Sequence, residues 1–178
     1  MTATIKTFEN KAKEFQKKAD KSDCYATGQP WLRKVQKLEG IIKAAKNLEK
    51  EIKTAEHNLE ALTNTVNDLI EKSTTDVDAV KVLVDNLKNT IKCKNEYLKA
   101  EITANGAKSE TTSAMKLEMA SLKTNLASLN EKLLNAKETL KKVKAERTEK
   151  IAEYKAEVVA AKTALKNFLT GHESELED

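Results

Sequence analysis

Apolar residues recur at alternating steps of three and four along most of the chain. The longest stripe lies in the last third and consists of Met115, Met119, Leu122, Leu126, Leu129, Leu133, Ala136, Leu140 and Val143. It resumes over Tyr154–Phe168 after one slip of a residue between Tyr154 and Val158. Such a stripe is typical of the seam of a coiled coil or a left-handed helical bundle. A long stripe needs an equally long partner surface, so the sequence predicts an elongated molecule.

The stripes and the turn residues between them predict four helices. We expect these helices over residues 3–20, 31–72, 76–105 and 113–170. Pro30 suits the first turn of the second helix, where a proline loses no hydrogen bond. Gly40 lies inside that helix, where it is either a tolerated cost of about 1 kcal/mol or the site of a close crossing or bend.

The segments between the predicted helices carry ordinary stop and start signals. Residues 73–76 predict a tight connection, with Thr75 and Asp78 spaced as in a capping box. Asn105-Gly106 predicts the end of the third helix, because glycine tolerates the left-handed conformation. The segments 21–30 and 105–112 are predicted loops, and 171–178 is a predicted flexible tail.

These elements predict an all-α fold. We expect one domain over residues 1–178, built as an elongated antiparallel three-to-four-helix bundle with coiled-coil-like heptad packing. The last helix is longer than its neighbours. It therefore overhangs an up-down-up bundle, or continues the third helix nearly collinearly across 105–112, or is covered by a second chain. We favour the bundle, with a homodimer as an option.

The composition supports long helices and argues against nucleic-acid binding. The chain has only 4 glycines and 1 proline, and 32 basic residues stand against 28 acidic ones. Only Arg33 and Arg147 are arginines, whereas recognition of phosphates and base edges prefers arginine. We therefore expect no nucleic-acid partner. The N-terminal sequence lacks the apolar region of a signal peptide, and no apolar run is long enough to span a membrane.

No set of residues predicts catalysis or metal binding. Carboxylates alternate with lysines at helical spacing, as in Glu138 with Lys142, which is typical of exposed helix surfaces. The two histidines, His57 and His172, form no zinc pattern with the cysteines. We expect a non-enzymatic protein with no cofactor.

The sequence leaves open whether its two cysteines form a disulfide. A disulfide between Cys24 and Cys93 requires the segment 21–30 to lie back along the bundle and reach the third helix. Otherwise the helix rise places the two thiols tens of ångströms apart. A formed bridge would indicate an oxidising location.

Two other places attract attention. Tyr25, Pro30 and Trp31 form either a cap on the end of the bundle or a partner-contact patch. Arg147 and Lys150 lie where the seam should be apolar. They are either long side chains that reach solvent while Ile151 takes the core position, or a polar layer that fixes the register.

The favoured function is display or protein contact by a helical bundle. In composition and helix length the chain resembles the helical surface antigens of protozoan parasites and of spirochaetes, and this resemblance implies a coat or receptor role. Partners would then be another protein or a second copy. Alternatives are a BAR-like or amphipathic membrane-surface module, which would need lysines gathered on one face, and an intracellular coiled-coil scaffold subunit. A cell-surface or secreted location is favoured if a leader was removed, and a cytoplasmic one otherwise.

Overall fold

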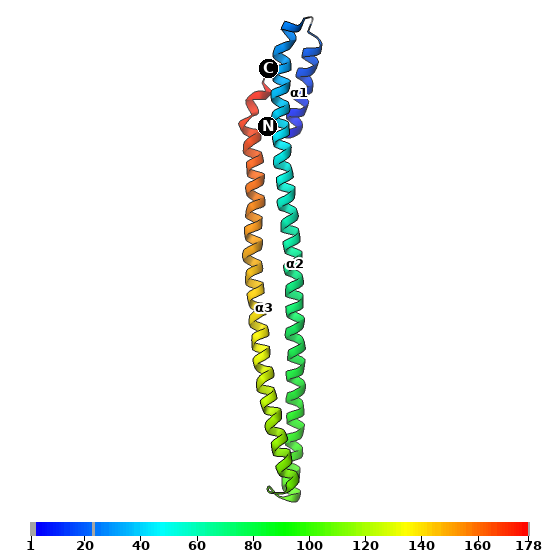
Figure 1. The fold of residues 1–178 in the computed structure, drawn as a ribbon, viewed down its shortest axis with the longest axis vertical. Helices are drawn as coiled ribbons and strands as arrows, with labels where there is room; N and C mark the ends of the chain where they lie inside the picture. The colour runs from blue at the N-terminus through cyan, green and yellow to red at the C-terminus, as the bar shows by residue number, and fades with distance from the viewer. Residues whose placement is uncertain (1–2, 23, 178) are drawn as a thin grey trace. The chain divides into compact units, whose positions relative to one another are not determined.

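The chain folds into helices joined by short turns. The computed structural model describes residues 3–22 and 24–177, in which α1 covers Ile5–Asp20, α2 Tyr25–Asn105 and α3 Glu110–Gly171, followed by the short 3-10 helix η1 at Glu173–Leu176 (Figure 1). The described residues contain no strand, so the all-α prediction is confirmed. Asp23 of the predicted loop and Asp178 of the predicted tail lie outside these residues.

The chain divides into two compact units, and the single domain predicted from the sequence stays a prediction. The first unit contains the described residues up to Leu62 and those from Lys150 onward. The second unit is Thr63–Glu149. The first therefore combines α1 with the beginning of α2 and the end of α3, and the second contains the rest of α2, the turn and the beginning of α3.

The core of the first unit is built around α1. Phe8 and Phe15 of α1 are fully buried, and they pack with Leu38 of α2 and Leu169 of α3 in one apolar cluster. Figure 1 shows α1 beside the first turns of α2. Thr4 caps α1 in a reciprocal arrangement with Thr7, which satisfies backbone N–H groups that the first turn leaves without partners.

The predicted break at 73–76 is wrong, because α2 is one helix from Tyr25 to Asn105. The hydroxyls of Thr74 and Thr75 donate hydrogen bonds to the carbonyls of Ile70 and Glu71, one turn earlier in the same helix. Residues that could have capped a new helix thus bond back to the existing one. Ser73 is half-buried and occupies a seam position, so the spacing of three and four continues through this segment.

The beginning of α2 also differs from its prediction. The helix starts at Tyr25, and Pro30 lies inside it instead of in its first turn. The expected loop over 21–30 is therefore reduced to residues before Tyr25. At Gly40, a side chain would meet nothing within 4 Å, so no close helix crossing explains this glycine.

In the second unit, the chain reverses within four residues. Gly106 has φ of 86°, the left-handed conformation that glycine adopts without strain. The Ser109 hydroxyl accepts a hydrogen bond from the Thr112 backbone N–H, which caps α3. The fully buried Thr112 donates to the Gly106 carbonyl. These bonds fix the turn. Lys94 of α2 forms an ion pair with Glu118 of α3 (2.6 Å), so the two helices lie side by side after the turn. The alternative in which the chain continues collinearly across 105–112 is therefore wrong.

Burial follows steps of three and four along both long helices, with one irregularity in each. Two steps of four follow one another at Leu62, Val66 and Ile70 in α2, and at Val143, Arg147 and Ile151 in α3. The slip in α3 thus lies before Tyr154, not after it as predicted. In both helices the extra step of four residues lengthens a seven-residue repeat to eleven, which locally straightens the seam.

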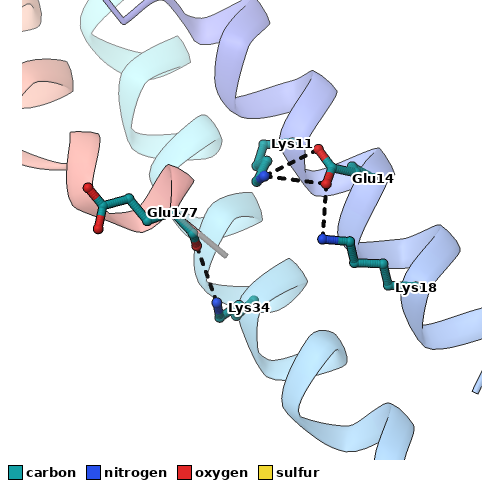
Figure 2. A network of polar contacts seen from close by, with 5 residues as sticks. All are labelled: Lys11, Glu14, Lys18, Lys34 and Glu177. Atoms are coloured by element: carbon teal, nitrogen blue, oxygen red, sulfur yellow. Dashed lines mark hydrogen bonds and ion pairs between the residues drawn. The ribbon is translucent and has the colours of Figure 1, made fainter.

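The segment after α3 is docked, contrary to the predicted flexible tail. The backbone N–H of Ala3 donates to Glu173, Lys37 pairs with Glu175 (2.7 Å), and Leu176 packs against the apolar cluster. Figure 2 shows Lys34 donating to the backbone carbonyl of Glu177, near the ion pairs that Glu14 forms with two lysines of α1. The acidic end of the chain is therefore held by lysines of α2.

Candidate contact surfaces

The described helices offer exposed surfaces beside their seam. Within residues 3–22 and 24–177, no group of three or more His, Cys, Asp or Glu side chains could hold a metal ion. No helix among these residues is long and apolar enough to cross a membrane. Charge is distributed unevenly on the two sides of the seam.

One side of the second unit is nearly free of charge between residues 79 and 139, and Lys72, Asp76, Lys142 and Glu146 occupy the equivalent positions beyond that range. On α2 this side consists of Ala79, Leu83, Asn86, Thr90, Cys93, Tyr97, Ala100 and Ala104, and on α3 of Ala114, Glu118, Ser121, Asn125, Ser128, Lys132, Asn135 and Thr139. All of these residues are exposed, and we call them the uncharged flank. Only Glu118 and Lys132 carry charge, in a chain of which 34% is charged. Tyr97 is 71% exposed and Leu83 is 53% exposed.

The two helices bring their uncharged residues to the same side. A shallow groove is lined by Leu83, Asn86, Leu87 and Thr90 of α2 and by Asn125, Ser128, Leu129 and Lys132 of α3. A second groove, lined by Asn89, Cys93, Lys94, Tyr97 and Met115, adjoins it at Thr90, and its one charged lining residue, Lys94, is paired with Glu118. The uncharged flank is thus one continuous surface across both helices.

The opposite side of the seam is basic. This lysine flank consists of Lys81, Lys88, Lys92, Lys99, Lys116, Lys123, Lys137, Lys141 and Lys144. Over residues 81–102 and 113–144, Asp85 is the one acidic residue among those that directly follow a seam position. All nine lysines are exposed. Nine of the fourteen lysines of this unit are therefore on one side, although acids and lysines alternate along the linear sequence.

The structure separates the two residues of the predicted polar layer. Arg147 is half-buried in the seam, whereas Lys150 is exposed. The Arg147 Nε atom is buried and lacks a hydrogen-bond partner, unlike every other such buried side-chain atom in the described part of the chain. Arg147 therefore takes the core position between Val143 and Ile151, and Lys150 does not contribute to it.

The aromatic patch is also divided. The Trp31 ring packs on Phe15 of α1, with ring centroids 5.5 Å apart, and Lys18 and Lys34 lie over the Trp31 ring. Tyr25 is 80% exposed and Pro30 is exposed. Trp31 therefore packs against the apolar cluster of the first unit, and its role as a cap on the bundle end stays a prediction. A partner contact at Tyr25 and Pro30 stays a prediction.

Both cysteines are free thiols, so the Cys24–Cys93 disulfide is not formed in this structure. The segment that had to lie back along the bundle is helical from Tyr25 and cannot do so. A hydrogen bond from the Thr27 side chain, whose oxygen lies 3.4 Å from the sulfur, lowers the pKa of the exposed Cys24 thiol. Cys93 lies on the uncharged flank.

Sequence reasoning missed both flanks, although the signal was present. The seam residues fix the angular position of every other residue on each helix. Residues just before a seam position, spaced by seven at Leu83, Thr90 and Tyr97, then fall on one side of the helix. Comparing charge position by position around the seam, instead of along the chain, would have revealed the segregation.

Comparison with other proteins adds no assignment. No protein-family description matches the chain, and neither the curated proteins nor the solved structures give a significant match.

Proposed function

We propose that this is a non-enzymatic helical protein that works by protein contact through the uncharged flank of residues 79–139. The observation that supports this proposal is the near absence of charge over a surface that includes the exposed side chains of Leu83 and Tyr97. Charged residues are depleted at the centres of protein interfaces, and tyrosine is enriched there. A solvated helix surface in a chain this rich in lysine and glutamate has no reason to exclude charge on one side.

The burial pattern also favours a specific packing of the helices, which we include in the proposal. The parts of α2 and α3 in the second unit pack as an antiparallel heptad pair, and the first unit is a helical bundle to which α1 adds a third helix. A heptad pair of two helices buries one stripe on each and leaves both sides of the seam open. The compositional resemblance to helical surface antigens favours a cell-surface setting for this contact.

Photo-crosslinking from adjacent residues tests the contact function. A photoreactive amino acid replaces Ser128 on the uncharged flank or, as the matched control, Ala127 on the side of the lysine flank, in cells that make the protein. We expect a discrete higher-mass adduct from position 128 and none from position 127. Equal labelling from both positions, or none from either, would contradict a contact through this surface.

A second candidate function rests on the lysine flank. Nine exposed lysines on one side of the second unit meet the requirement that a membrane-surface module gathers its lysines on one face. Each lysine near an anionic leaflet contributes about 1 kcal/mol to binding. We expect the protein to bind vesicles that contain phosphatidylserine at physiological salt and not neutral vesicles. Binding that survives replacement of Lys81, Lys88 and Lys137 by glutamine would count against this candidate.

A further inference from the structure

We infer that the partner of the uncharged flank is a second copy of this chain, related by a twofold axis that passes over both Thr90 and Asn125. This inference rests on the contact function proposed above and names its partner. Both residues line the central groove of the flank, one from each helix. They therefore mark the level along the hairpin at which a symmetric pairing would be centred.

The flank is self-complementary about that level. Leu83 and Tyr97 lie seven residues before and after Thr90, and Glu118 and Lys132 lie seven residues before and after Asn125. Seven residues correspond to about 10.5 Å along a helix. A twofold axis in the plane of the interface and perpendicular to the helices lays α2 on α2 and α3 on α3, antiparallel. Each Leu83 then meets the Tyr97 of the other copy, and each Glu118 meets its Lys132.

The charges exclude the other way of pairing the same surfaces. A twofold axis parallel to the helices would lay α2 on α3, so that Lys132 would lie against Leu83 and Glu118 against Tyr97. That arrangement desolvates two charges without giving either an opposite charge on the second copy. The perpendicular axis brings two pairs of opposite charges together at the rim and places apolar side chains and small polar ones between them.

The area suffices for a specific dimer. The flank extends over about 26 residues of α2, which is roughly 40 Å, and two adjacent helices are roughly 20 Å wide. Pairing would cover about 800 Å² per copy, the size of a standard protein interface. An isologous contact of this kind closes after two copies.

A cysteine on the axis tests the register directly. In a chain with Cys24→Ser and Cys93→Ser, Thr90→Cys places two thiols opposite one another across the axis. We expect mild oxidation to yield a covalent dimer with Thr90→Cys and monomer with the matched control Lys92→Cys on the lysine flank. A dimer linked more readily through Lys92→Cys would overturn the assignment.

Charge exchange tests the same register without a covalent bond. We expect Glu118→Lys alone and Lys132→Glu alone each to weaken dimerisation about tenfold by light scattering, and the double variant to recover most of the loss. The pair between Lys94 and Glu118 within one chain stays broken in the double variant, so recovery reports the contact between copies. Equal weakening in all three variants, or a monomeric wild type at 100 µM, would overturn self-pairing. In that case an adduct from position 128 to a different protein would leave the contact function standing.

Discussion

Two glycines of this protein differ in whether their surroundings accept a side chain. One lies inside α2 and the other directly follows it. Gly40 lies within the helix with open space around the position of a side chain, whereas Gly106 holds the left-handed backbone of the turn. The same substitution should therefore have opposite effects at the two positions.

We expect Gly40→Ala to raise the free energy of unfolding by about 0.5–1 kcal/mol, because alanine restricts the unfolded chain and favours helix. Gly106→Ala should lower it by about 1 kcal/mol, because a side chain strains the positive φ. Urea unfolding followed by circular dichroism measures both. A stabilising Gly106→Ala variant would show that the turn does not require this backbone conformation.

Arg147 is the residue in the seam whose chemistry fits least well. Its buried Nε lacks a hydrogen-bond partner, and a buried unsatisfied donor costs about 1–3 kcal/mol. We expect Arg147→Met to raise the free energy of unfolding by about 1 kcal/mol. The exposed Lys150 provides the control, since Lys150→Met should change stability little. A loss of stability with Arg147→Met would indicate that the guanidinium has a partner that matters to the fold.

At the scale of elements, α1 is joined to α2 by an ion pair whose carboxylate has a lowered pKa. Lys46 of α2 forms a hydrogen bond and ion pair with Glu9 (2.7 Å) and lowers the pKa of Glu9 below its ordinary value of 4.5. Lys18 and Lys11 lower the pKa of Glu14. Because these pKa values fall on folding, the carboxylates stabilise the folded state above pH 4.5, and that contribution is lost as the pH falls through 4.5 toward the folded values.

Trp31 reports on α1, because it is the single tryptophan and packs on Phe15. We expect its fluorescence emission to shift to longer wavelength as the pH falls below 4.5. In Glu9→Gln, the shift between pH 6 and pH 4 should be smaller, because one of the titrating groups is gone. Identical pH profiles for wild type and variant would show that Glu9 does not contribute to holding α1.

The sequence predicted the helices better than their continuity. The bounds of α1 and α3 and the end of α2 agree with the predicted ranges to within a few residues, because apolar periodicity, Asn105-Gly106 and Gly171 are strong local signals. The break at 73–76 failed because Ser, Thr and Asp serve equally well as caps and as side chains that bond within a helix. The docked end of the chain was missed because its ion pairs join residues far apart in the sequence, such as Lys37 and Glu175.

At the scale of the molecule, the two flanks of the second unit make separate predictions that can be tested together. Dimerisation should resist added salt more than vesicle binding does, because the uncharged flank buries apolar and small polar groups while the lysine flank acts through screened charges. We expect 0.5 M NaCl to release the protein from anionic vesicles and to leave the dimer largely intact by light scattering. Loss of both at the same salt concentration would indicate that a single charged surface carries both properties.

The two flanks lie on opposite sides of one seam, and this arrangement sets the valency of the assembly. Two copies joined through their uncharged flanks would turn their lysines outward in opposite directions. The pair would then be a cross-bridge with an adhesive edge on each side, able to join two anionic surfaces instead of coating one. Mixing with anionic vesicles should therefore raise turbidity by clustering them, and a Thr90→Lys variant, kept monomeric by charge on the axis, should bind the same vesicles without clustering them.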